Sequence, residues 1–305
     1  MKLIIRYILT WIKETDKTYL LLVSLLTAIA VFLNYHFNLL KWITSLPIPF
    51  PRFFGLYILF LACFGLPYLL YVLTRKNNLF KHRSFLILLF LAPAIFALKM
   101  AIKPNFYPGI NAYWDRYINQ VIYWPALLFI VITILFITWN YRKTPGSFYG
   151  LTIKNFNWQP YALMILIMVP ALAIVSTQPD FLHTYPKLKM VLPFPDNAEN
   201  TWIYTGIFEL SYAADFLTVE VFFRGFLVIG FIKYAGKNVI LPMACFYCAI
   251  HFGKPLAECI SSYFGGILLG IIAYNTRSII GGLMIHIGIA WLMEVGGYLG
   301  NLLKE

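Results

Sequence analysis

The feature that most constrains this 305-residue chain is a succession of nine long apolar segments joined by short polar loops. A helix needs roughly 20 apolar residues to cross the hydrocarbon core of a bilayer. The segments cover approximately residues 19–40, 53–74, 84–102, 120–140, 160–177, 201–233, 238–253, 256–275 and 279–299. The sequence therefore predicts an all-α, polytopic integral membrane protein with about 8–9 transmembrane helices. We expect its C-terminal helical bundle to enclose a polar cavity.

The composition agrees with a chain dissolved in lipid. Hydrophobic residues make up 61% of the chain, charged residues only 12%, and the mean hydropathy is +0.75. Globular domains usually carry about 25% charged residues. The net charge of +12 comes from short basic clusters between apolar segments, a pattern typical of topology signals and of contact with anionic lipids. This pattern predicts membrane lipids as partners and argues against nucleic acid.

The distribution of Lys and Arg between the loops predicts the orientation. With the N-terminus inside and nine spans, the inner segments carry 14 Lys and Arg residues and the outer segments carry 8. Because positive charge accumulates on the cytoplasmic side, we expect a cytoplasmic N-terminus. Residues 1–18 lack the pattern of a signal peptide and predict an interfacial helix that leads into the first span.

A shift in composition near residue 150 predicts two regions. The apolar segments before it hold almost no ionisable side chain beyond Lys99. The stretch from 201 to 294 holds Glu209, Asp215, Glu220, Arg224, His251, Glu258, His286 and Glu294. We therefore expect residues 1–145 to form a transmembrane scaffold of about four spans, and residues 146–305 to form the working core.

Four ionisable residues in the apolar helices of this core are candidates for a functional site: Glu220, Arg224, His251 and His286. A charged side chain at mid-membrane costs roughly 2.5–3.5 kcal/mol even on the lenient insertion scale, so such residues usually face the protein interior. Glu220 and Arg224 are four residues apart and could be a structural ion pair, and each histidine alone could be a core residue. Packing in a bilayer does not require two imidazoles, however, so the set together favours chemistry.

The order and spacing of these residues resemble the CPBP intramembrane protease family, also called the Abi family. This group contains CAAX prenyl endopeptidases and bacteriocin-processing enzymes. The resemblance rests on a Glu-x-x-x-Arg-Gly segment that begins at Glu220, on His251, on a glycine-rich span and on His286. It covers about residues 148–298 and includes the short segment 148–151 before the core.

The resemblance implies an intramembrane endopeptidase that hydrolyses a peptide bond of a membrane-associated or lipidated protein. Glu220 and His251 would activate a water molecule, with Arg224 holding the carboxylate ionised, and His286 would stabilise the oxyanion. The expected location is the plasma membrane of a bacterium. The expected partner is a protein or peptide substrate within the membrane.

Two further hypotheses concern the groups that would assist this chemistry. Glu220, His251 and His286 form a ligand set of the kind found in zinc hydrolases, so a divalent metal such as zinc is an alternative to a metal-free mechanism. Glu258, Glu209 and Glu294 are additional carboxylates that could act instead of Glu220.

Three positions depart from the family pattern. Val219 stands where the family has the first of two glutamates, Tyr247 replaces a phenylalanine, and Ala290 stands where an Asn or Asp would help to bind the oxyanion. These departures leave open a second hypothesis, a non-catalytic relative that binds a peptide or helix in the same cavity. Convergence of Glu220, His251 and His286 around one cavity is the expectation that separates the catalytic hypothesis from the others.

Overall fold

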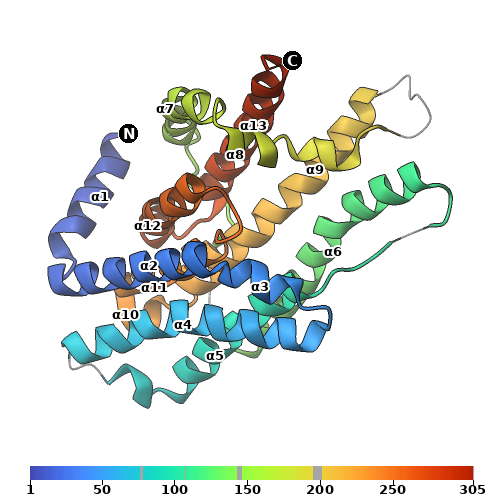
Figure 1. Cartoon of the computed structure of the whole chain (residues 1–305). Helices are drawn as coiled ribbons and strands as arrows, with labels where there is room; N and C mark the ends of the chain where they lie inside the picture. The colour runs from blue at the N-terminus through green and yellow to red at the C-terminus, as the bar shows by residue number, and fades with distance from the viewer. Residues whose placement is uncertain (76–77, 107, 143–145, 195–200, 305) are drawn as a thin grey trace. The chain divides into compact units, whose positions relative to one another are not determined.

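The computed structural model describes residues 1–75, 78–106, 108–142, 146–194 and 201–304, and these ranges contain helices but no strand (Figure 1). The predicted all-α class is confirmed. Contacts group the chain into two compact units. The first comprises Met1–Ile102, Ile134–Ile153 and Val221–Ile279, and the second comprises Lys103–Thr133, Lys154–Glu220 and Ile280–Glu305.

Each unit takes residues from both sides of the predicted boundary between 145 and 146. Residue 145 itself lies outside the described residues. The boundary was inferred from composition along the chain, whereas the units reflect contacts in space, so the scaffold and the core stay predictions.

The first unit is built around a short buried helix, α11. All ten of its residues, Ile240–Ala249, are buried, and it packs against α2, α4 and α12. Its Phe246 ring lies 5.0 Å from the ring of Phe60 in α4, measured between centroids. The helices of this unit are α1 (Lys2–Glu14), α2 (Lys17–Phe37), α3 (Leu39–Ser45), α4 (Pro49–Arg75), η1 (Leu79–Lys81), α5 (Arg83–Ala101), the end of α6 (Ala112–Tyr141), η2 (Phe148–Gly150), η4 (Val221–Ile229), α10 (Ile232–Ala235), η5 (Gly236–Val239), α11 and α12 (Leu256–Thr276).

The second unit is organised around α13 (Ile280–Leu302), which contacts α7, α8 and α9. Glycines on α13 permit this close approach. A Cβ at Gly281 would lie 2.3 Å from the Tyr161 ring, and one at Gly297 would lie 2.6 Å from the carbonyl carbon of Tyr185. The other helices of this unit are the start of α6, α7 (Gln159–Val175), α8 (Pro179–Thr184), η3 (Lys187–Val191) and α9 (Thr201–Glu220).

Six described helices are long and apolar enough to cross a membrane: α2, α4, α5, α6, α12 and α13. A bent pair formed by Gln159–Val175 and Pro179–Val191, with an angle of 102°, would raise the number to seven. The predicted count of 8–9 is therefore not confirmed. Three of the predicted spans are absent from the six. The helix α7 has only 17 residues and counts only within the bent pair, α9 carries three acidic residues, and α11 has only ten residues.

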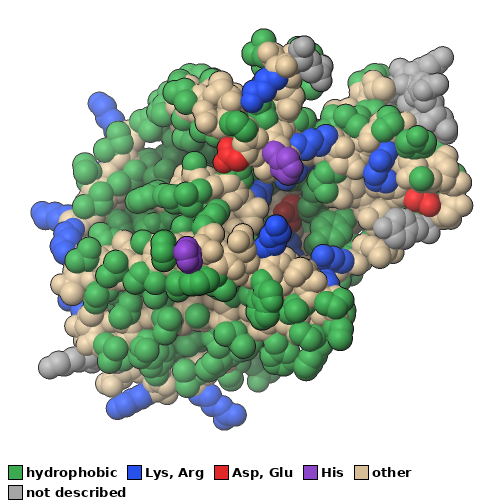
Figure 2. All heavy atoms as spheres, in the orientation of Figure 1, with side chains coloured by type: hydrophobic (Ala, Val, Ile, Leu, Met, Phe, Trp, Pro, Cys, Tyr) green, Lys and Arg blue, Asp and Glu red, His purple; other side chains and the backbone are tan. Residues whose placement is uncertain are grey.

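The surface agrees with a lipid environment. Hydrophobic side chains cover much of the face seen in Figure 2, and few acidic side chains appear on it. Large apolar side chains of the candidate spans are exposed, including Leu21 and Phe32 on α2 and Phe129 on α6. The chain is an integral membrane protein. The residues predicted to form an interfacial helix are helical over Lys2–Glu14, whereas the orientation of the N-terminus stays a prediction.

Candidate functional site

The glutamate of the candidate site lies where the helix changes type. α9 ends at Glu220, and the next nine residues, Val221–Ile229, form the π-helix η4. The Gly230 N–H donates to the Gly225 carbonyl oxygen at 3.0 Å, a bond that spans five residues instead of four. The helix α9 runs without interruption from Thr201 to Glu220. π-turns are rare and often occur at functional sites.

Glu220 reaches one of the two candidate histidines. Its Oε1 lies 3.0 Å from Nδ1 of His286, and the glutamate is completely buried, whereas 15% of the His286 side chain is exposed. The Phe216 ring lies 4.8 Å from the imidazole. Because a carboxylate oxygen accepts, the hydrogen of this bond belongs on Nδ1, which leaves Nε2 of a neutral imidazole with a lone pair. The pair therefore combines an imidazole with a carboxylate that fixes its tautomer.

A glycine on α13 provides the space that the carboxylate occupies. A Cβ built at Gly282 would lie only 2.5 Å from Oε2 of Glu220. Gly282 is one turn before His286 on the same helix, so the side that holds the imidazole is also the side that admits the glutamate. Any larger residue at position 282 would displace the carboxylate.

Within the first unit, Tyr247 connects the arginine to the other histidine. The guanidinium carbon of the fully buried Arg224 lies 4.1 Å from the centroid of the Tyr247 ring, and this ring lies 4.7 Å from that of His251. Nδ1 of His251 is 2.8 Å from the Tyr247 carbonyl oxygen. Because a carbonyl oxygen can only accept, Nδ1 carries the hydrogen here too. The ring that replaces the family's phenylalanine thus packs against both groups.

The short segment at residues 148–151, which contains η2, packs against η4. Tyr149 is buried, adopts a positive φ of 42°, and touches Gly225, where a Cβ would lie 2.7 Å from the Tyr149 carbonyl oxygen. Burial raises the pKa of Tyr149 to about 12. Ile279 N–H donates to the Gly150 carbonyl oxygen at 3.0 Å. The turn at 148–150 therefore links η4 to the connection between α12 and α13.

Two of the additional carboxylates have partners of their own. Glu294 accepts from the backbone N–H groups of Lys187 at 2.7 Å and Leu188 at 3.1 Å, which satisfies donors at the start of η3. Glu258 lies 3.3 Å from Nζ of Lys254, in the first turn of α12, where an acidic side chain stabilises a helix N-terminus. These bonds suit structural roles, and the hypothesis that either carboxylate replaces Glu220 stays untested.

The two positions that depart from the family pattern are filled by packing. Val219 is buried. The Ala290 methyl group lies in the core of the second unit with Tyr117, Trp124, Phe208 and Tyr212. An amide or carboxylate at position 290 would have to be buried among these rings. The aromatic surroundings of position 290 explain why alanine fits there.

A zinc ion is the alternative expected at Glu220, His251 and His286. The part of the chain that the structure describes has no group of three or more His, Cys, Asp or Glu side chains arranged to hold a metal ion. Oε1 of Glu220 is engaged by His286, and catalytic zinc usually has three protein ligands. The third residue of the expected ligand set, His251, lies in the first unit. The hypothesis of a metal therefore stays untested.

The structure thus brings together two pairs of the predicted residues. Glu220 meets His286 in the second unit, and Arg224 and His251 share the Tyr247 ring in the first. The predicted convergence of Glu220, His251 and His286 stays a prediction. The space that Gly282 leaves for the Glu220 carboxylate was not predicted. The Gly-Gly pair shortly before His286 was the available signal in the sequence.

These features define a helical integral membrane protein with an imidazole–carboxylate pair buried among its helices. Residues 200–292 match the family described as type II CAAX prenyl endopeptidase Rce1-like, in agreement with the resemblance to the CPBP and CAAX protease family. The resemblance recognised in the sequence is confirmed over these residues. No curated protein and no solved structure matches the chain significantly.

Proposed function

We propose that this chain is an intramembrane endopeptidase in which His286 activates the attacking water and Glu220 supports it. One observation carries the proposal: the 3.0 Å bond between Nδ1 of His286 and Oε1 of a fully buried Glu220. An imidazole held by a carboxylate is a recurrent general base, since the carboxylate fixes the tautomer and stabilises the imidazolium. The match of residues 200–292 to a peptidase family supports the reaction type.

In the proposed reaction, Nε2 of His286 takes a proton from water. The resulting hydroxide oxygen forms a bond to the carbonyl carbon of the peptide, and the charge on the imidazolium is balanced by Glu220. When the tetrahedral intermediate collapses, the carbon–nitrogen bond breaks and the proton passes from Nε2 to the leaving amine. Water is thereby divided between the new carboxyl and amino groups.

This division of roles differs from the one that the family resemblance implies, in which Glu220 and His251 activate the water and His286 binds the oxyanion. The bond between Glu220 and His286 supports the new division. His251, with Nδ1 engaged by the Tyr247 carbonyl oxygen, is the second candidate base. The substrate class that we propose is a membrane-associated or lipidated protein, and the expected location is the plasma membrane of a bacterium.

The test is cleavage of a candidate membrane substrate by the purified protein and its variants. We expect His286→Ala and Glu220→Gln to lower kcat at least a hundredfold, in the range that general acid–base groups contribute. The control is His183→Ala, which removes an exposed imidazole on α8. Wild-type cleavage rates for His286→Ala would contradict the proposal. Loss of cleavage in His251→Ala but not in His286→Ala would favour His251 as the base that activates the water. Cleavage in the presence of a chelator tests separately for a metal, because a metal-free enzyme stays active when divalent ions are removed.

The alternative is a non-catalytic relative that binds a peptide or helix without cleaving it. Ala290 is the observation in its favour, because its methyl group packs in an aromatic cluster and offers no group to an oxyanion. Binding of an intact substrate peptide by the wild type, with no cleavage under any condition, would support this alternative.

A further inference from the structure

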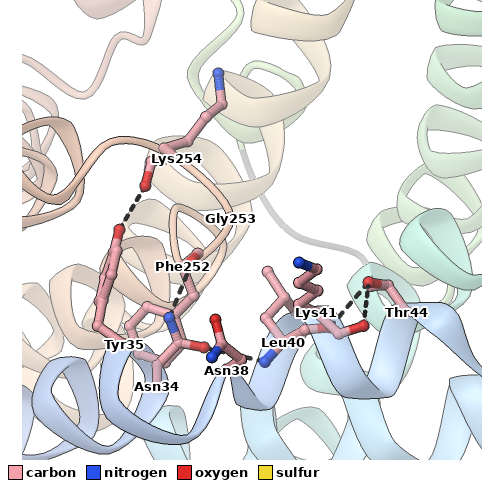
Figure 3. A pocket seen from close by; sticks show the side chains of 9 residues that line it. All are labelled: Asn34, Tyr35, Asn38, Leu40, Lys41, Thr44, Phe252, Gly253 and Lys254. Carbon is pink, nitrogen blue, oxygen red and sulfur yellow. Dashed lines mark hydrogen bonds between the residues drawn. The ribbon is translucent and has the colours of Figure 1, made fainter. Parts of the chain in front are cut away.

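A polar pocket lies in the first unit where α2 turns into α3. It has a volume of about 360 Å³ and also involves the loop that follows α11. Two hydrogen bonds tie that loop to α2, from Asn34 Nδ2 to the Phe252 carbonyl oxygen at 2.9 Å and from the Tyr35 hydroxyl to the Lys254 carbonyl oxygen at 2.6 Å (Figure 3). The lining residues are Asn34, Tyr35, Asn38, Leu40, Lys41, Thr44, Phe252, Gly253 and Lys254.

The pocket carries positive charge. Lys41 and Lys254 both line it, and Figure 3 shows Lys41 on α3 and the Lys254 side chain extending from the loop that follows α11. Lys254 also forms an ion pair with Glu258, at 3.3 Å, so the three side chains together leave a net charge of +1. Asn38 and Thr44 add neutral polar groups. Such a lining suits a singly charged anionic group.

A second, apolar pocket of about 360 Å³ lies on the same helix. It is bounded by α2, α11 and α12, and the Ser24 and Tyr263 hydroxyl oxygens lie 3.0 Å apart within its lining. Its lining residues are Ser24, Thr27, Ala28, Val31, Phe32, Cys248, Ile260, Tyr263 and Phe264. This lining suits a hydrocarbon chain.

Both pockets use one stripe of α2. Ser24, Thr27, Val31, Asn34 and Asn38 follow one another at intervals of three or four residues, the spacing of a single helix face. At 1.5 Å per residue, the 14 residues from the first to the last span about 21 Å. One leaflet of a bilayer with its headgroups measures roughly 20–22 Å. The polar and apolar pockets are therefore placed as the head and tail of one lipid would be.

We infer that this face of α2 binds an anionic phospholipid, with its phosphate between Lys41 and Lys254 and an acyl chain against α12. The place of the polar pocket agrees with this assignment, because Asn38 caps the end of α2 and an exposed Trp42 ring nearby is typical of a headgroup region. A soluble anion would use only the polar pocket. The apolar pocket that continues along the same stripe is what indicates a lipid.

The first test measures binding of phosphatidylglycerol and phosphatidylcholine to the purified full-length protein by native mass spectrometry. The wild type should retain phosphatidylglycerol in preference. Lys41→Gln should weaken this retention about fivefold, and Lys41→Gln with Lys254→Gln about thirtyfold, as expected for lysines at an anionic lipid surface. Lys13→Gln, an exposed lysine on α1, is the matched control and should change nothing.

A second pair of variants tests the tail. Ala28→Trp fills the apolar pocket and should also reduce retention, whereas Leu25→Trp on the exposed side of α2 should not. Equal retention of both lipids by the wild type, or unchanged binding in the double lysine variant, would overturn the inference. Displacement of the lipid by inorganic phosphate, with Ala28→Trp behaving as wild type, would identify an anion site instead. Thermal unfolding of each variant shows whether it is folded.

Discussion

Replacing Gly282 by alanine is the sharpest test of the Glu220–His286 pair. The added Cβ would lie 2.5 Å from Oε2 of Glu220, whereas Cβ atoms essentially never approach another heavy atom within 3.0 Å. The obstructing atom is the end of a side chain, so the least costly response is a rotation of the carboxylate. That rotation would break its bond to Nδ1 of His286.

The expected magnitudes differ for stability and activity. Overpacking of a core usually lowers the free energy of unfolding by about 1–3 kcal/mol. Because the carboxylate can rotate, we expect the loss for Gly282→Ala to lie toward the lower end of this range. Loss of the orienting carboxylate in an imidazole dyad lowers kcat by up to about 10⁴-fold. We therefore expect a folded protein with cleavage reduced by roughly a hundredfold or more.

Two measurements decide the outcome: substrate cleavage and the ¹⁵N spectrum of labelled histidine, which reports the Nδ1 bond directly. Gly265→Ala is the matched control, because it adds a methyl group to a helical glycine with nothing within 4 Å. It should leave cleavage unchanged and stabilise α12 by about 0.5–1 kcal/mol. A folded Gly282→Ala variant with wild-type cleavage and an unchanged His286 signal would refute the reasoning.

Substitutions at three further positions test the surroundings of the site. Tyr247→Phe should keep wild-type cleavage, whereas Tyr247→Leu should lower kcat about tenfold, because the His251 ring packs against the aromatic ring. Measurement of kcat at several pH values checks this. Glu294→Gln should lower the free energy of unfolding by about 1–3 kcal/mol, since two backbone N–H groups lose a charged acceptor, and the folded protein should keep its kcat. A loss of kcat without a change in stability would indicate a catalytic role. Gly225→Ala should destabilise by about 1–3 kcal/mol in thermal unfolding, because the Tyr149 backbone lies 2.7 Å from the new Cβ and cannot rotate away; an unchanged melting temperature would contradict that contact.

The lengths of the apolar segments predicted most of the helices because a bilayer restricts what twenty apolar residues can form. The segments near 53–74 and 84–102, for example, became α4 and α5 with ends that differ by a few residues. The predicted number of spans is not confirmed, and one reason is that hydropathy does not distinguish lipid from protein surroundings. The segment at 238–253 is apolar, yet its helix, α11, is short and buried by neighbouring helices.

The candidate site was predictable as a set of residues but not as a set of contacts. The sequence singled out Glu220 and His286 because ionisable groups are costly in apolar helices. It could not pair them, since 66 positions separate the two residues and helical periodicity relates only near neighbours. The tautomers of both histidines were equally inaccessible, because each depends on an acceptor that the fold supplies.

The π-helix at Val221–Ile229 has a consequence for comparing this chain with its relatives. A turn closed over five residues accommodates one residue more than an α-turn, so η4 acts as a one-residue insertion within a continuous helix. A gapless alignment to a relative that is α-helical throughout is therefore out of step by one position on one side of η4. Deleting one residue from η4 would return the helix to α geometry and rotate whatever follows by about 100°. Residue equivalences on the two sides of η4 need to be assigned separately.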